Sequence, residues 1–276
     1  MTGKTKIEWT DKTDNPIHLT KADGSHGGHW CRKLSAGCSK CYAETIYINP
    51  GYFRFASGLK YSGKPPENLQ FDTDAVEKWK TAKKPWKRFV CSMTDLFGDW
   101  VPYEWQRKVF DEAALAPSQT IQLLTKRPDL AALTTTKWLV DNGVTKMPEN
   151  IWMGVTIEDQ QEATNRLPFV NDISHLFHIT WVSYEPALTD VDWTPYDFLD
   201  WMVIGGESGS EAREFKLAWA KKALEFCDRN DIPAFMKQMG TNPIGQNGQP
   251  KFMGRKGKDM ELWPAWAQKR EFPYAN

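Results

Sequence analysis

Three cysteines lie within eleven residues near the start of the sequence, in the pattern Cys31-x6-Cys38-x2-Cys41. The segment between them is polar and contains glycine, so packing in an apolar core does not explain their presence. A Cys-x2-Cys turn suits zinc and iron–sulfur centres equally well, and three thiolates are one ligand short of a closed tetrahedral site. The spacing therefore predicts a metal site with an open position.

Two occupants of this site follow from the residues alone. In a [4Fe–4S] cluster, three thiolates leave one iron open for a substrate or cofactor. In a zinc site, the fourth ligand would be His26 or His29, which belong to the loop that precedes the cysteines (residues 17–30). The cysteines follow the first predicted strand, and this position favours the cluster because it places them on the face where other polar groups are expected.

Short apolar runs recur from residue 88 onward, and each run ends in a polar or glycine-containing cluster. The clusters begin 22 to 33 residues apart, a spacing that suits βαβ units. Helical patterns cover 103–116 and 217–229, and the proline-rich segment 185–201 predicts an irregular crossover. The predicted strands are 6–9, 88–91, 120–124, 151–155, 180–182, 201–204 and 233–236.

Apolar strands that alternate with helices indicate a parallel sheet. We predict an α/β fold, a TIM-barrel-like partial (β/α) barrel of six to seven parallel strands. The barrel would span residues 1–240 and carry an N-terminal cysteine loop, and residues 241–276 would form a C-terminal extension packed on it. Residues 10–30 are predicted to form a loop that contains glycine and histidine, and residues 49–85 a lid.

The carboxyl ends of parallel strands meet on one face, where both barrels and open sheets have their active sites. Asp95, Glu158 and Glu185 occupy equivalent places in successive units, although each can instead satisfy the backbone N–H groups at a helix start. Lys126 and Arg127 can bind a carboxylate or phosphate, or can form a solvated turn. The recurrence of ionisable groups at strand ends favours a site.

The run Gly205-Gly206-Glu207 is a second candidate for ligand binding. Glycines at a strand end let a ligand approach the backbone, and Glu207 can accept a hydrogen bond from an ammonium or ribose hydroxyl group. The alternative is a tight turn between a strand and a helix. We assign catalysis to Glu158, Glu185 and Lys126, and cofactor contacts to Ser92, Asp95, Thr125, Arg127, Ser183, Gly205, Gly206 and Glu207.

Composition excludes several classes of protein. Lys plus Arg and Asp plus Glu each number 35, and this balance argues against an avid non-specific DNA binder without excluding a nucleotide or flipped base as substrate. The charge balance therefore leaves nucleic acid possible as a partner but does not indicate it. No apolar stretch approaches the length of a membrane span, and the N-terminus lacks a signal-peptide core. Five cysteines do not suggest a disulfide framework, so we expect a cytoplasmic protein without a membrane partner.

Further motifs follow one another from about residue 5 to 240, and together they resemble those of the phage-type three-cysteine family. That family is found in phages and bacteria, and it is placed at the fringe of the radical S-adenosylmethionine superfamily. Besides the cysteine run and Tyr42–Glu44 after it, the motifs are Lys6–Thr10, Asn15-Pro16, Ser92–Phe97, Leu124–Pro128, Gly154–Asp159, Tyr184–Pro186 and Val203–Gly209.

The resemblance implies an enzyme that holds a [4Fe–4S] cluster on Cys31, Cys38 and Cys41, with S-adenosylmethionine at the open iron. A reducing electron donor would supply one electron, and the resulting 5′-deoxyadenosyl radical would modify a small polar substrate such as a nucleobase or nucleotide. The superfamily usually has Cys-x3-Cys-x2-Cys with an aromatic residue before the third cysteine. Here the first gap is six, Lys40 precedes Cys41 and Tyr42 follows it.

Two alternatives stay open from the sequence. One is a zinc-site protein of the same fold that hydrolyses or binds nucleic acid. The other is a non-catalytic partner protein in which a metal has only a structural role.

Overall fold

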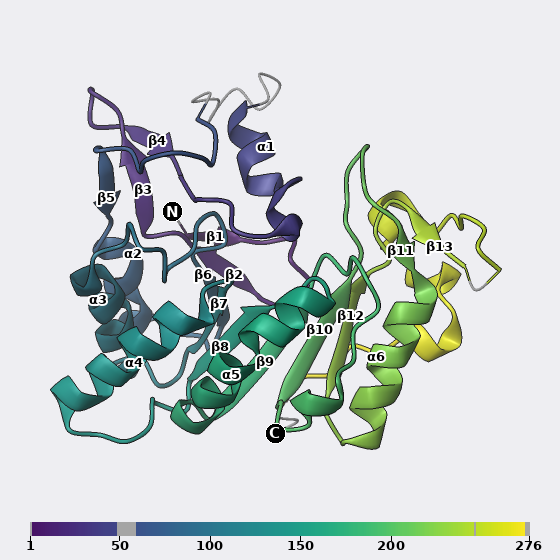
Figure 1. Ribbon diagram of the computed structural model, residues 1–276. Coiled ribbons are helices and arrows are strands. Elements are labelled where there is room, and N and C mark those ends of the chain that lie inside the picture. Colours follow the sequence, from purple (N-terminus) through teal and green to yellow (C-terminus); the bar gives the residue numbers. More distant parts are fainter. Residues whose placement is uncertain (1, 49–58, 246, 274–276) are drawn as a thin grey trace. The chain divides into compact units, whose positions relative to one another are not determined.

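Figure 1 shows the computed structural model, which describes residues 2–48, 59–245 and 247–273. In these residues the largest sheet has the strand order β1-β2-β6-β7-β8-β9-β10-β12, and every strand except β1 runs parallel to the others. The predicted fold class, α/β with a partial (β/α) barrel of parallel strands, is confirmed. The strands are β1 Thr2–Lys4, β2 Lys12–Asp14, β6 Lys87–Val90, β7 Thr120–Thr125, β8 Ile151–Thr156, β9 Ile179–Tyr184, β10 Trp201–Gly205 and β12 Ala234–Gln238.

The chain divides into two compact units. Unit 1 comprises residues 1–153 and 176–178, and unit 2 comprises residues 154–175 and 179–276. Outside the large sheet, the elements of unit 1 are β3 Ile17–Thr20, β4 His26–Gly28, β5 Leu69–Phe71, α1 Tyr42–Ile48, α2 Asp74–Glu77, α3 Tyr103–Ala114, α4 Pro128–Asn142 and the 3-10 turns η1 Ala36–Cys38 and η3 Lys78–Thr81. Residues 49–58, part of the predicted lid, lie outside the described residues.

The first parallel strand of unit 1 is β2, so the prediction of a strand over residues 6–9 is wrong. That segment ends in a turn, and its apolar signal comes from Trp9, which is buried against Phe89 of β6 with ring centroids 4.8 Å apart. Strand β2 is polar instead, because its buried Asp14 pairs with Arg88 of β6 at 3.0 Å. A strand whose inward residue is an ion-paired carboxylate carries no apolar pattern for sequence analysis to detect.

Residues 10–30 form strands, so the prediction of a loop there is also wrong. Strand β3 pairs with both β4 and β5 in a small antiparallel sheet of order β4-β3-β5. Buried Ile17 and Leu19 alternate with half-buried His18 and Thr20 along β3, the period of two that a half-buried strand shows. In a strand of three or four residues, the alternation of buried and exposed positions is too short to distinguish the strand from a loop in the sequence.

Helix α3 follows strand β6 and helix α4 follows strand β7. α3 begins after Pro102, which suits a helix start because it lacks an N–H group, and its buried residues Gln106, Val109, Phe110 and Ala113 recur at helical spacing. α4 has Pro128 in its first turn and ends before a glycine, Gly143, at φ 66°. The helix predicted over residues 103–116 is confirmed.

In unit 2, every residue of β9 and β10 is buried. Strand β10 pairs in parallel with β9 through Val203 and Ser183, and with β12 through Val203 and Phe235. Helix α6 spans Leu217–Arg229 as predicted, and the crossover 185–201 contains the 3-10 turn η4 Thr194–Tyr196. The remaining elements from residue 154 on are α5 Gln160–Leu176, β11 Phe215–Lys216, β13 Pro243–Ile244, η5 Arg255–Gly257, η6 Met260–Leu262 and η7 Ala265–Ala267.

No helix in the described ranges combines the length and the apolar character that crossing a bilayer requires.

Candidate functional site

The three cysteines lie on one short segment of unit 1. Cys31 is in the extended connection after β4, Cys38 ends the 3-10 turn η1, and Cys41 immediately precedes α1. The Cys41 amide donates to the carbonyl of Cys38 at 3.3 Å, and the Cys38 amide donates to Ser35 at 2.9 Å, so two successive turns hold the second and third thiols. All three thiols are free and partly exposed, whereas Cys91 and Cys227 are free and buried.

The surroundings of Cys31 and Cys41 affect the pKa values of these two thiols. Burial raises the pKa of the Cys31 thiol, Asp95 raises it further, and the Arg127 guanidinium opposes that rise. Smaller contributions to the same pKa come from Cys41 and Cys38. Burial also raises the pKa of Cys41, while backbone N–H groups of α1 hydrogen-bond to its sulfur and, together with the Lys126 ammonium, oppose the rise. The triplet thus lies beside polar groups from the carboxyl ends of β6 and β7.

Asp95 is the centre of a buried hydrogen-bond network at those strand ends. One carboxylate oxygen accepts from the Thr125 hydroxyl at 2.7 Å and from the Phe97 amide at 3.1 Å. The other accepts from the Arg127 guanidinium at 2.9 Å and from the Lys126 amide at 3.2 Å. Every member except the half-buried Lys126 side chain is buried. The network therefore satisfies the carboxylate from within the protein.

Arg127 connects this network to the cysteine segment. Its guanidinium donates to the backbone carbonyl of Arg32, the residue after Cys31, at 2.9 Å. The Trp100 ring lies beside both guanidinium groups, 4.7 Å from Arg127 and 5.4 Å from Arg32. One guanidinium nitrogen of Arg32 also donates to both carboxylate oxygens of Asp99, at 2.7 and 2.9 Å. Arg127, predicted as a cofactor contact, is thus in contact with residues that fix the position of Cys31.

Two further interactions hold the cysteine segment. The Asn15 side chain exchanges hydrogen bonds with the Ser92 hydroxyl at 3.1 and 3.2 Å, and the Ser92 carbonyl accepts from the Tyr42 hydroxyl at 2.6 Å. Buried Glu44 accepts from the Tyr61 amide at 2.8 Å and pairs with Lys33. Ser92, another predicted cofactor contact, is therefore adjacent to the segment that follows Cys41.

The histidines that sequence analysis proposed as a fourth zinc ligand belong to a separate cluster. The His29 ring contacts the Tyr47 hydroxyl at 2.5 Å and the His26 ring at a centroid distance of 4.9 Å. His26 Nδ1 accepts from the Gly28 amide at 3.1 Å, so the neutral ring carries its proton on Nε2 and presents no lone pair there to a metal. The contacts of His26 therefore do not favour it as the fourth ligand of a Cys3His site.

The types of donor present are those that an iron–sulfur cluster uses. No three His, Cys, Asp or Glu side chains converge on a common point for a single ion in the part of the chain that the structure describes. A cluster binds each thiolate at a different iron, so its ligands need not converge. Three free thiols on one segment, with amide and cationic neighbours, are the donor set that a cluster with one open iron requires.

In unit 2, the carboxyl ends of β9, β10 and β12 form a second polar cluster. The Glu185 carboxylate pairs with Lys237 Nζ at 3.1 Å and accepts from the Ser183 hydroxyl at 3.3 Å. A Cβ atom on Gly205 would lie 2.5 Å from Glu185 Oε1, so the absence of a side chain at Gly205 makes room for this carboxylate. Gly206 exchanges hydrogen bonds with Gln238 at 3.0 Å. The structure thus brings four of the predicted residues together: Ser183, Glu185, Gly205 and Gly206.

Two predicted site residues of unit 2 have arginine partners that sequence analysis did not identify. Glu158 is fully buried and pairs with Arg166 of α5 at 2.7 Å. Glu207 accepts three hydrogen bonds from Arg213 at 2.6, 2.9 and 3.0 Å. The sequence offers no local signal for Arg166, because its pairing with Glu158 depends on how α5 packs.

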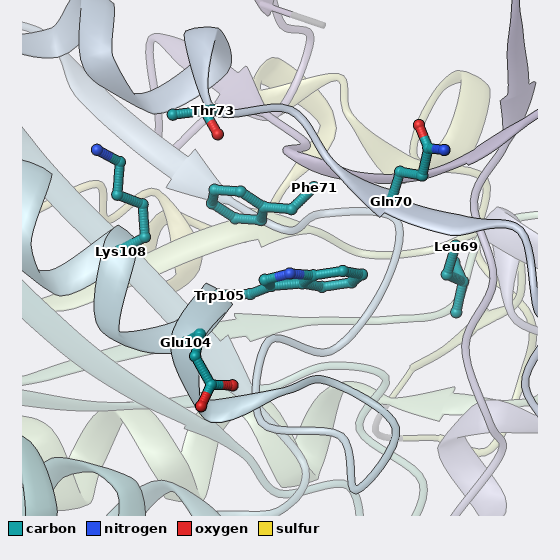
Figure 2. A pocket seen from close by; sticks show the side chains of 7 residues that line it. All are labelled: Leu69, Gln70, Phe71, Thr73, Glu104, Trp105 and Lys108. Carbon is teal, nitrogen blue, oxygen red and sulfur yellow. The ribbon is translucent and has the colours of Figure 1, made fainter. Parts of the chain in front are cut away.

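An open cavity of about 600 Å³ lies elsewhere in unit 1, between the β5 segment and α3. Figure 2 shows Phe71 and Trp105 lying one over the other, with ring centroids 5.9 Å apart. Lys108 at its edge pairs with Glu77 and Glu112 at 2.7 and 2.9 Å. The lining residues, Leu69, Gln70, Phe71, Thr73, Glu104, Trp105 and Lys108, include none of the predicted site residues.

The protein is thus an α/β protein with a largely parallel sheet and a segment that carries three free cysteines. The chain belongs to the family described as a protein of unknown function (DUF5131), which it matches over residues 4–264. Neither a curated protein nor a solved structure matches the chain.

Proposed function

We propose that the chain is an iron–sulfur enzyme of the radical S-adenosylmethionine type, with a [4Fe–4S] cluster on Cys31, Cys38 and Cys41. The observation that carries the proposal is the set of three free, partly exposed cysteines on a single segment, two of them held by successive turns. When bound, the cluster would supply the electron and the open iron for cleavage of S-adenosylmethionine to a radical that abstracts hydrogen from the substrate.

The neighbours of the cysteines support thiolate ligands. Burial raises the pKa of Cys41, but backbone N–H groups of α1 and the Lys126 ammonium oppose the rise and favour the charged form. Hydrogen bonds and positive charge around ligand sulfurs also tune the reduction potential of a cluster. We therefore assign Lys126 to the electrostatics of the site, and Ser92 to the polar surface beside it.

Asp95, Thr125 and Arg127 act as positioning residues in this proposal. Their network is buried, and it reaches the cysteine segment through the hydrogen bond from Arg127 to the Arg32 carbonyl. Fixing that carbonyl fixes the backbone next to Cys31. A ligand held by a rigid supporting network keeps its geometry when the bound group changes charge.

In unit 2, Glu185 and Lys237 are the pair suited to hold and move a proton. They are partly buried and in contact, and the absence of a side chain at Gly205 leaves room for the Glu185 carboxylate. We assign the substrate or cofactor contacts of this unit to Ser183, Gly205 and Gly206. Glu158 and Glu207 each pair with an arginine, which favours structural roles for them. A reducing protein as electron donor, a small polar substrate and a cytoplasmic location complete the proposal.

The test is anaerobic purification followed by reconstitution with iron and sulfide. Iron and sulfide content, visible absorption and electron spin resonance are measured with and without S-adenosylmethionine, and 5′-deoxyadenosine is assayed with dithionite. We expect about four irons per chain, a spectrum that changes on cofactor addition, and product formation.

Cys38→Ala should lose the cluster signal and the product, whereas Cys227→Ala, which removes a buried thiol in unit 2, should keep both. A colourless protein with stoichiometric zinc would contradict the proposal. A cluster whose spectrum does not change when S-adenosylmethionine is added would instead indicate that the metal has only a structural role.

A further inference from the structure

Residues 251–258, here called the basic loop, combine positive charge with an exposed aromatic ring. The loop contains Lys251, Arg255, Lys256 and Lys258 and no acidic residue, although the whole chain has a formal net charge of zero. Phe252 lies among these cations with 81% of its surface exposed, more than any other large apolar residue in the described part of the chain. Such exposure of an apolar ring has a cost in water that burial against a ligand would remove.

Buried residues and hydrogen bonds hold the basic loop in a defined conformation. The buried Met253 and Gly257 anchor it, and the Gly257 carbonyl accepts from the Met239 amide at 2.9 Å and from the Trp263 indole at 3.0 Å. Gly254, Lys256 and Gly257 have φ values of 76°, 61° and 64°. A left-handed conformation at a lysine is uncommon and needs support from its surroundings. The anchored residues thus present Phe252, Arg255 and Lys256 outward in a preorganised conformation.

The anchors place the basic loop next to the strand-end cluster of unit 2. A Cβ atom on Gly257 would lie 2.3 Å from the Gly240 carbonyl, and one on Gly240 would lie 2.5 Å from the Glu207 carbonyl. Glu207 and Gly240 follow β10 and β12 directly, and β12 carries Lys237 of the Glu185 pair. A chain bound along the basic loop is therefore close to the carboxyl ends of these strands.

The charges and the exposed aromatic ring of the basic loop indicate which class of ligand it can bind. Repeated cations match repeated phosphates, and an exposed aromatic ring stacks on a base that is not already stacked, which a single strand offers and a duplex does not. A membrane surface fits less well, because Met253 is buried and Phe252 is the one apolar side chain of the loop that is exposed. We propose that the basic loop binds single-stranded nucleic acid, with Arg255 and Lys256 on phosphates and Phe252 stacked on a base.

Binding is measured by fluorescence anisotropy of a labelled twelve-nucleotide oligo(dT) with the full chain, without iron, at several salt concentrations. Phe252→Ala should weaken binding roughly 5- to 150-fold and leave the salt slope unchanged, because it removes stacking and no charge. Arg255→Gln with Lys256→Gln should make the slope of log affinity against log salt about 1.4 less steep, because two phosphate contacts are lost. The binding needs no cluster, so it can fail or succeed independently of the proposed enzyme activity.

The matched control is Lys83→Gln with Lys84→Gln, which removes two exposed cations from unit 1 and should leave oligonucleotide binding unchanged. Thermal unfolding of each variant checks that the fold is kept. Equal losses in the two double variants, or an unchanged affinity in Phe252→Ala, would overturn the proposal. Binding to vesicles of phosphatidylcholine and phosphatidylserine without binding to oligo(dT) would also overturn it, in favour of a membrane surface.

Discussion

At the scale of single residues, the candidate sites rest on buried charges with internal partners. Asp95 has four hydrogen-bond donors and Glu158 has a buried arginine. A buried carboxylate with its partner in place contributes little net stability, but it becomes costly when that partner is removed. These pairs therefore act mainly by fixing where the chain can lie, which makes single substitutions informative.

Arg127→Gln should lower the free energy of unfolding by about 3–5 kcal/mol, because the Asp95 charge would be left buried without its cation. Urea unfolding of the protein without metal measures this change. Arg107→Gln is a suitable control, because the exposed pair with Asp111 at 3.4 Å should contribute less than about 1 kcal/mol. Equal effects of the two substitutions would show that the Asp95 network is not held as described.

Gly205→Ala should disrupt the pair between Glu185 and Lys237, because the new methyl group would lie 2.5 Å from the Glu185 carboxylate. We expect a loss of about 1–3 kcal/mol of stability, the usual range for overpacking. Thermal unfolding measures it. Ser183→Ala removes a hydroxyl at 3.3 Å without adding an atom, and a loss there as large as that for Gly205→Ala would argue against a steric cause.

At the scale of elements, the small antiparallel sheet of unit 1 carries stacked histidines. The ring centroids of His18 on β3 and His26 on β4 lie 4.6 Å apart, and His29 follows in edge contact with His26. Burial, and then the charge of His18, lower the pKa of His26 to about 4, while Asp72 opposes the shift. A neutral His26 ring is therefore part of the folded state of this sheet.

The pKa of His26 predicts a stability that falls in acid. Between about pH 6.5 and 4 the unfolded chain takes up a proton that the folded chain does not, so the free energy of unfolding falls as the pH is lowered through that window. Because His26 is only half-buried, we expect a change of roughly 1–2 kcal/mol. Urea unfolding at pH 7 and pH 4.5 should show a smaller difference in His26→Asn, and an equal difference would contradict this role.

Sequence patterns predicted the long elements and failed on the short ones. Strands β8, β9 and β10 are apolar runs of five or six buried residues, and α6 has amphipathic spacing, so each left a clear signal. β2 left none, because its buried residue is Asp14. The partners of the strand-end acids were also missed, since the pairing of Arg166 with Glu158 depends on how α5 packs and has no local signature.

At the scale of the whole molecule, cations and acids are equal in number but unevenly placed. Each class has 35 members, yet the basic loop carries four cations and no acid. Equal totals remove the long-range repulsion that keeps molecules apart, while local patches of one sign remain able to attract partners. The chain as a whole is therefore neutral, and its surface is not uniform.

This balance predicts a solubility minimum near neutral pH. Precipitation by polyethylene glycol should need less precipitant near pH 7 than at pH 5.5 or 8.5, because net charge on either side of neutrality raises solubility. Added salt at pH 7 should raise the amount of precipitant needed if attraction between opposite patches drives the association. A solubility that rises steadily from pH 5.5 to pH 8.5, with no minimum near pH 7, would contradict the predicted minimum.

The division of the five cysteines between surface and interior has a consequence for labelling chemistry. Cys31, Cys38 and Cys41 are partly exposed, whereas Cys91 and Cys227 are buried in the folded chain. An alkylating reagent should therefore modify only these three sites in the native protein without metal, more slowly at Cys31 and Cys41, where burial raises the pKa, and all five sites after unfolding. A bound metal or cluster would reduce the native number to zero, so the mass of the alkylated protein reports occupancy directly.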